Sequence, residues 1–412
     1  MNPSNKIAFY IADKRHFDYF VNVIDEVKKA GGEVMLVIND TRSQGDVQQL
    51  DQHYTDEMAQ LANERGLPYI FSLDAINSGT VFSLIVSTFS YTYKIPHGKK
   101  RLKRVLVRNA AKYLGKPLKN LLPRFISEKI AIYTADDYPI NRWEYPEHLL
   151  AKRSVFFPKG LDVSDDYPNP VLRKIADYYF CHGEYDKKIM EKNIGKEIFE
   201  IGYPRYDKLN NLDDTNQANL ITEFGMDESK PLICWIPTYV RDKRNILEWI
   251  PHFKALKDSY NLLIRPHPKQ IERDDGSLSE LLKETGFYID LQDDREMTQL
   301  YTQARLICCD YGGTIFSAIY IGANLLLLNL SDHDSIAAKR NKSADIRVRE
   351  KLFNLSPDEA VQSGGLQSVI SDQNLTNTQS EQLKLVRKEY FGDVNLGEGS
   401  NKTAKKLLSL IS

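Results

Sequence analysis

Two short segments of the chain combine cationic and hydroxyl side chains that suit the binding of a phosphate group. Arg265 and His267 stand in the sequence Arg-Pro-His-Pro. A guanidinium can bind phosphate through two N–H groups, and an imidazole can donate a hydrogen bond or act as an acid. Thr238 and Arg241, which follow Trp-Ile-Pro, add a hydroxyl and a second cation. A histidine in a loop can also be purely structural, and that alternative stays open for His267.

A third segment has the composition of a phosphate-binding turn. An apolar run ends at Asp310, two glycines follow at Gly312 and Gly313, and Thr314 can cap a helix that starts at once. Glycines allow close approach of the backbone, and free N–H groups at a helix N-terminus attract anions. The alternative is a tight strand-to-helix turn without a ligand.

The elements before these three segments must bring them together. Each segment follows an apolar run that predicts a buried strand, at 232–235, 261–264 and 306–309. The carboxyl ends of parallel strands meet at one edge of a sheet, which is where open α/β sheets bind ligands. The sequence therefore predicts an anion site at one sheet edge.

Strands and helices alternate along most of the chain, which predicts an α/β fold with parallel sheets. We expect two Rossmann-like domains that face each other across a cleft. The first, 1–205, is the acceptor-binding and membrane-facing domain and carries a basic insertion at 99–150. The second, 206–400, holds the nucleotide donor, and a C-terminal helix, 401–412, crosses back to the first domain. The further strands we expect lie at 7–11, 33–38, 67–71, 82–87, 154–157, 177–180, 197–201, 287–291 and 325–328.

Charge is distributed unevenly along the 412 residues. The chain has 55 basic and 56 acidic residues, for a net charge of −1, which excludes nucleic-acid binding through bulk charge. Residues 98–129 nevertheless hold eleven Lys or Arg and a single acid, Glu128. A solvated charged face is the default interpretation of such a run. Apolar residues at helical spacing favour instead an anionic membrane surface or an anionic polymer as the partner.

Other sequence features predict neither a metal nor a cofactor. The four cysteines show no metal-ligand or redox spacing, and no cluster of carboxylates stands out. No apolar signal region and no run of about 18 apolar residues occur, so we expect a cytoplasmic protein that does not cross the membrane.

Four motifs together resemble the CDP-glycerol glycerophosphotransferase family, the teichoic-acid-type polymerases and primases. They occur in the family's order and approximate spacing, over roughly residues 170–412. The motifs are Gly202-Tyr-Pro-Arg-Tyr-Asp, Pro237-Thr-Tyr-Val-Arg-Asp, Arg265-Pro-His and Asp310-Tyr-Gly-Gly. This resemblance implies a GT-B fold, a CDP-activated donor on the C-terminal domain, metal-independent transfer, and attachment to the inner face of a bacterial membrane.

Three residues depart from the family pattern. The family has Asp-Tyr-Ser-Ser with an aspartate four residues later, whereas this chain has Gly312, Gly313 and Ser317. The glycine pair is similar to that of UDP-N-acetylglucosamine 2-epimerases and many sugar transferases. The paired glutamates of those epimerases are replaced here by Phe316 and Ser317. We therefore expect a UDP- or CMP-sugar glycosyltransferase for capsule or lipopolysaccharide as the main alternative, and rank an epimerase below it.

The resemblance also implies a catalytic histidine in the N-terminal domain. His97, in Ile-Pro-His-Gly, is the candidate for the base that deprotonates an acceptor hydroxyl. Lys159 occupies the other position that fits the family's spacing, where it would bind phosphate, and His182 follows a predicted strand that could face the cleft. Both are alternative catalytic or phosphate-binding candidates, and for His182 a structural role as a loop histidine stays open as well.

The predicted junction of the two domains carries a further motif. Gly202, Arg205 and Asp207 lie there, either as substrate contacts or as a rigid hinge with a structural ion pair. The sequence as a whole predicts the transfer of glycerol phosphate, or a related unit, from a CDP-activated donor to a hydroxyl of a cell-surface glycan or lipid-linked acceptor.

Overall fold

The computed structural model describes nine stretches of the chain. They are residues 4–11, 14–40, 48–89, 145–161, 175–211, 219–292, 295–340, 343–393 and 395–411. The predicted base His97 and the whole basic stretch 98–129 lie outside these residues, as does the insertion 99–150 up to residue 144. Their roles therefore remain predictions.

The first sheet has seven parallel strands in the order β3-β2-β1-β4-β5-β6-β7. The direction of winding reverses between β1 and β4, and the crevice at such a switch point is where doubly wound sheets bind ligands. The strands are β1 (Ser4–Ile11), β2 (Val34–Ile38), β3 (Tyr69–Phe71), β4 (Phe82–Ser87), β5 (Ala151–Phe156), β6 (Tyr178–Cys181) and β7 (Ile198–Glu200).

The second sheet has six parallel strands in the order β10-β9-β8-β11-β12-β13. Its central strands are almost wholly buried, which explains why they are continuous apolar runs in the sequence. The strands are β8 (Leu232–Ile236), β9 (Asn261–Ile264), β10 (Tyr288–Ile289), β11 (Leu306–Cys309), β12 (Leu325–Leu328) and β13 (Asn354–Leu355).

Helices cover both sheets, as an α/β fold requires. In the N-terminal half they are α1 (Lys14–Lys29), α2 (Gln48–Glu64), α3 (Ser72–Asn77), α6 (Pro146–Leu150) and α7 (Glu184–Ile194). The 3-10 helix η4 (Pro204–Asn211) leads out of that half. The helices that follow are α8 (Leu220–Glu223), α9 (Arg244–Lys254), α10 (Pro268–Glu272), α11 (Ser277–Thr285), α12 (Met297–Gln303), α13 (Gly313–Ile321), α14 (His333–Lys339), α15 (Ala344–Arg347), the 3-10 helix η5 (Val348–Glu350), α16 (Pro357–Gln362), α17 (Leu366–Ser371), α18 (Gln373–Phe391) and α19 (Gly399–Ile411).

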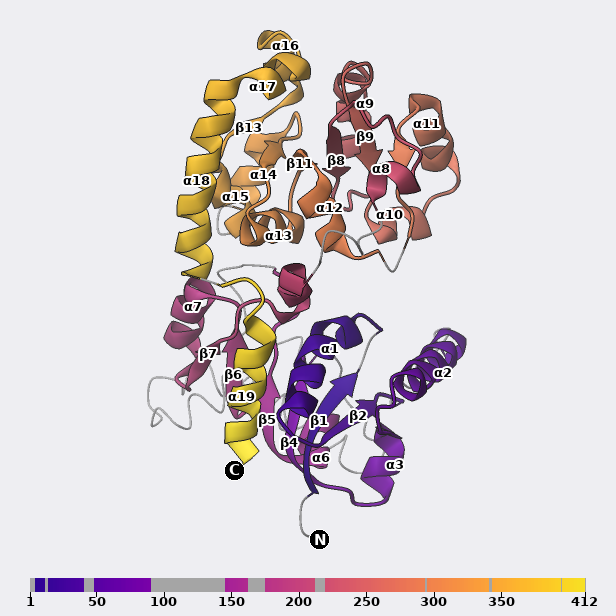
Figure 1. Ribbon diagram of the computed structural model, residues 1–412, viewed down its shortest axis with the longest axis vertical. Coiled ribbons are helices and arrows are strands. Elements are labelled where there is room, and N and C mark those ends of the chain that lie inside the picture. Colours follow the sequence, from indigo (N-terminus) through magenta and orange to yellow (C-terminus); the bar gives the residue numbers. More distant parts are fainter. Residues whose placement is uncertain are drawn as a thin grey trace, which may run out of the picture.

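The last helix returns to the first half of the molecule, as predicted. Figure 1 shows α18 along the second half and α19 beside α1 in the first half. Leu407 and Leu410 of α19 belong to the same buried cluster as Val23 and Val27 of α1. The approach is close at Gly32, where an added Cβ would lie 2.7 Å from a methyl carbon of Leu408.

The two sheets and the returning helix confirm the predicted fold class, a GT-B-like pair of Rossmann-like halves. The domain limits drawn at residues 205 and 400 stay predictions. None of the helices in the described stretches is long and apolar enough to span a lipid bilayer.

Candidate donor-binding site

Three predicted site segments do lie at one edge of the second sheet. They follow β8, β9 and β11, which are neighbours in the order β9-β8-β11 and run parallel. Their carboxyl ends carry Thr238, Arg265 and Asp310 respectively. The fold thus places these residues together as the hydrophobic pattern predicts.

Asp310 organises the turn after β11 and is not open to a ligand. Its carboxylate accepts hydrogen bonds from the backbone N–H of Thr238 at 2.7 Å, the backbone N–H of Tyr311 at 2.8 Å and the side-chain amide of Asn245 at 2.6 Å. The side chain is buried, and burial raises the pKa of the carboxyl while these hydrogen bonds lower it. Asp310 therefore ties β8 to β11.

The glycine pair begins helix α13 with its N-terminus open. Gly312 has φ +87° and ψ −161°, a region that only glycine adopts without strain, and Gly313 lies close to the backbone oxygen of Leu161, 3.4 Å from where a Cβ would be. No side chain caps α13, and its first turn contains no acid. The first-turn N–H groups, including that of Thr314, are therefore suited to an anion.

Arg265 is already paired with a buried carboxylate. Its Nη1 lies 2.7 Å from Oδ2 of Asp290, and Nε of Arg295 lies 2.7 Å from the same oxygen. Both side chains around Asp290 are buried. A ligand at Arg265 would have to use the N–H groups that do not face Asp290.

His267 and Arg241 differ in how firmly they are held. His267 caps α10: its Nδ1 accepts a hydrogen bond from the backbone N–H of Lys269 at 3.1 Å, so a neutral ring carries its proton on Nε2. This tautomer is the one that can donate to a phosphate oxygen through Nε2. Arg241 is exposed in the loop after β8.

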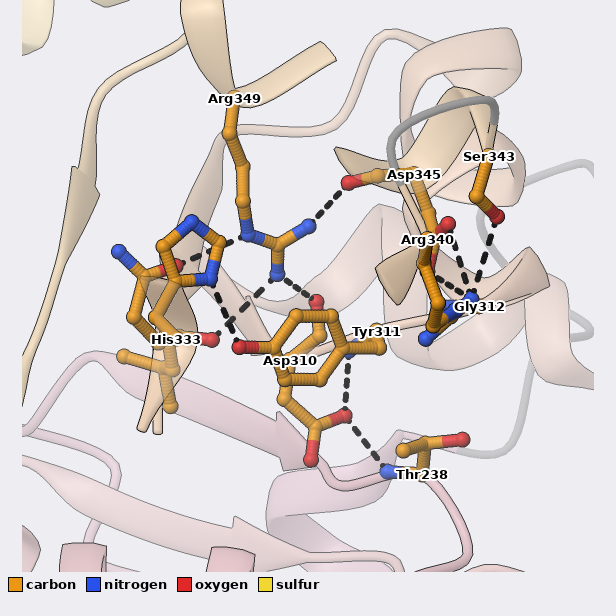
Figure 2. A network of polar contacts seen from close by, with 11 residues as sticks. Thr238, Asp310, Tyr311, Gly312, His333, Arg340, Ser343, Asp345 and Arg349 are labelled. Atoms are coloured by element: carbon orange, nitrogen blue, oxygen red, sulfur yellow. Dashed lines mark hydrogen bonds and ion pairs between the residues drawn. The ribbon is translucent and has the colours of Figure 1, made fainter. Parts of the chain in front are cut away.

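Four residues that the sequence did not single out surround the same turn. Asp345, Arg340, Arg349 and His333 form a polar network with Tyr311 and Gly312, shown in Figure 2. All four come after β12, from α14 to η5 and the turn between them. In the sequence they look like the charged face of exposed helices, and no local pattern distinguishes them.

His182 and Lys159 stand on the N-terminal side. His182 follows β6, is buried, and its Nδ1 lies 2.9 Å from the backbone oxygen of Gly202. Burial lowers its pKa to about 4, so the ring is neutral at pH 7. Its ring meets that of Tyr203 edge to face at 4.9 Å. Lys159 follows β5 and is exposed.

Arg205 and Asp207 do not pair with each other. Nη2 of Arg205 lies 3.7 Å from Oδ2 of Asp18 on α1, and the Asp207 carboxylate accepts a hydrogen bond from the backbone N–H of Ser400 at the start of α19. Both residues lie in the 3-10 helix η4, where side chains two positions apart point in different directions. Asp207 thus caps the returning helix, and burial raises the pKa of its carboxyl.

Comparison with known proteins supports the resemblance drawn from the sequence. The model of the CDP-glycerol:poly(glycerophosphate) glycerophosphotransferase family matches residues 170–320, which include Arg265, His267 and the Asp310 turn. No curated protein matches the chain.

Solved structures share the fold over nearly the whole chain. The wall teichoic acid polymerase TagF is 15% identical with a TM-score of 0.57, covering 99% of this chain and 89% of that one. The UDP-GlcNAc 2-epimerase from Neisseria meningitidis, bound to UDP-GlcNAc, is 12% identical with a TM-score of 0.53, covering 98% and 100%. S. aureus MnaA with UDP is 12% identical with a TM-score of 0.51, covering 99% and 98%. At these identities the likeness shows the fold alone.

Proposed function

We propose that this protein is a transferase that moves glycerol phosphate, or a related polyol or sugar phosphate, from a CDP-activated donor to a hydroxyl group. The acceptor is a cell-surface glycan or a lipid-linked precursor of one. The observation that carries the proposal is the glycerophosphotransferase family match over 170–320, because the segment contains the converging strand ends.

The donor diphosphate lies at the carboxyl edge of the second sheet in this proposal. The open N-terminus of α13 binds its oxygens, and Thr238, Arg241 and Arg265 line the same edge. His267 donates through Nε2, which the N-cap bond at Nδ1 leaves protonated. These contacts stabilise the negative charge that develops in the transition state.

The transfer itself is an in-line displacement at phosphorus. His97 takes the proton of the acceptor hydroxyl, the hydroxyl oxygen forms a bond to the distal phosphorus, and the bond from that phosphorus to the bridging oxygen breaks. CMP leaves with the electron pair. We infer no metal and no cofactor for this step.

A donor panel tests the proposal. Labelled CDP-glycerol, CDP-ribitol, CMP-sugars and UDP-sugars are added to the protein, and the unfolding midpoint is followed, because only a ligand that binds the native state raises it. We expect CDP-glycerol or CDP-ribitol to do so. With the bound donor and an acceptor, the His97→Ala and His267→Ala double variant should lose transfer; full activity would contradict both assignments.

The second candidate is an inverting glycosyltransferase that uses a UDP- or CMP-sugar. The observation that favours it is the pair Gly312 and Gly313, which leaves no serine side chain in the turn. Protection by UDP- or CMP-sugars alone in the same panel would select it. An epimerase is disfavoured because Phe316 is a buried core residue and Ser317 carries no carboxylate.

A further inference from the structure

Arg340 places a cation beside the phosphate-binding turn, and two other residues hold it there. We propose that Arg340 contacts the phosphate of the donor, and that Asp345 and Arg349 are positioning residues for Arg340 and for the turn before α13. This inference rests on the donor site proposed above, and it names a contact that lies beyond the family match at 170–320.

The link between Arg340 and the turn is a single carboxylate. Oδ2 of Asp345 accepts the backbone N–H of Gly312 at 2.9 Å, and the same oxygen lies 2.8 Å from Nη2 of Arg340. Nη2 also reaches Oδ1 of Asp345 at 3.0 Å and the hydroxyl of Ser343 at 3.2 Å. Figure 2 shows the Asp345 carboxylate shared in this way by Arg340 and Gly312.

Only one end of the Arg340 guanidinium is used by these contacts. Every hydrogen bond found for its side chain within the described stretches comes from Nη2, and the side chain is 44% exposed. Nη1 and Nε therefore remain for a second acceptor. An arginine fixed at one nitrogen loses less conformational entropy when it binds phosphate than a free surface arginine does.

Asp345 makes this cation necessary. Its side chain is only 4% exposed, and its negative charge stands at the turn that is proposed to bind an anion. Unpaired, such a carboxylate would repel the donor diphosphate. Arg340 neutralises it and supplies N–H groups on the ligand side, so the pair removes a repulsion and adds a contact.

Arg349 fixes the backbone that carries Asp345. Its buried guanidinium donates to the side-chain oxygen of Asn329 at 2.9 Å and to the backbone oxygens of Asp310 and Asp345. It also lies 4.3 Å from the centre of the Tyr311 ring. A buried guanidinium is tolerated only when its N–H groups find acceptors, and these acceptors join the end of β11 to α15. Arg349 thus fixes the distance between the turn and Asp345.

Titration calorimetry on the full chain tests the contact, with CDP-glycerol as the probe and UDP-N-acetylglucosamine in parallel. Arg340→Gln should weaken binding of the donor by roughly tenfold to a hundredfold, the range for one lost charge-assisted hydrogen bond. Binding of cytidine, which has no phosphate, should be unchanged. Lys351→Gln is the matched control. Lys351 directly follows η5, is a cation with a 40% exposed side chain, and pairs with Glu389 of α18.

The outcomes separate the two levels of the proposal. Wild-type protein that binds neither donor overturns the proposed function and this inference with it. Donor binding by Arg340→Gln that equals wild type overturns the inference alone, and so does an equal loss for cytidine and donor, which would mean a general distortion.

Asp345→Asn distinguishes positioning from charge. The asparagine can still accept the Gly312 N–H, but it no longer holds Arg340 by charge, and the site becomes one charge more positive. If Asp345 acted through its charge alone, the donor would bind more tightly, and that result would overturn its positioning role. We expect weaker binding, by roughly tenfold, because Arg340 is released. Because substitution of the buried Arg349 can prevent folding, the test relies on Arg340 and Asp345.

Discussion

At the scale of single residues, Asp310 is held in place by its hydrogen bonds. It accepts three hydrogen bonds from two strand ends and one helix while buried. A carboxylate in this position acts on the ligand only through the backbone that it holds. These hydrogen bonds explain why an aspartate stands at this position of the motif. No catalytic role is needed to explain it.

Replacing Asp310 should destabilise the protein strongly. Asp310→Ala leaves three donors without an acceptor, two of them buried, and we expect a loss of about 3 kcal/mol in the free energy of unfolding. Urea unfolding measures this. Asp242→Ala, which removes an exposed acid from the loop after β8, should change it by less than about 0.5 kcal/mol. A loss at Asp310 no larger than that of the control would show that the network contributes nothing.

His182 predicts a pH dependence of stability. Its pKa is about 4 in the folded protein against 6.5 for an exposed histidine, so the unfolded chain binds the proton more tightly. Stability attributable to this residue is complete above pH 6.5 and is lost as the pH falls to 4, by about 3 kcal/mol in total.

The comparison with His182→Gln isolates that effect. Buried carboxyls with raised pKa values, such as those of Asp207 and Glu147, titrate in the opposite sense but are present in both proteins. We expect the wild type to lose more stability than the variant between pH 7 and pH 4 in urea titrations. Parallel curves for the two proteins would rule out a buried neutral histidine.

At the scale of elements, the turn between β11 and α13 is the most specific feature. Gly312→Ala forces a side chain into a conformation with φ +87° and ψ −161°, at a cost of about 1–3 kcal/mol. We expect a lower unfolding midpoint and weaker donor protection. Gly160→Ala is the control, because an added Cβ there meets no atom within 4 Å. Equal midpoints for the two variants would show that the turn is not strained by a side chain.

Most elements could be predicted from the hydrophobic pattern because buried parallel strands are apolar along their whole length. The pattern does not predict β13, since a strand of two residues is too short to produce a period. The three strand ends of the site were predicted for the same reason as the strands. The partner of Arg265 was not, because Asp290 lies 25 positions away and becomes a neighbour only through the pairing of β9 with β10.

At the scale of the whole molecule, charge is unevenly distributed between the stretch 98–129 and the rest of the chain. The stretch 98–129 carries eleven cations and one acid within a chain of net charge −1. We propose that this stretch attaches the protein to anionic lipid on the inner face of the membrane, where a lipid-linked acceptor is accessible.

Liposome flotation tests that attachment. Vesicles with anionic lipid should carry the wild-type protein upward at low salt, and neutralising the Lys and Arg residues between 99 and 126 should abolish this. Vesicles of neutral lipid serve as the control. Undiminished flotation of the neutralised variant would contradict the proposed attachment.

The return of α19 to the first half also sets the order in which the molecule can fold during synthesis. The ribosome completes β1 to β7 long before it reaches Leu407, yet the core around α1 includes this residue. Until residues 399–411 emerge, the apolar surface that α19 covers stays open to water and to chaperones. The N-terminal half therefore reaches its final packing only after the C-terminal half has been made.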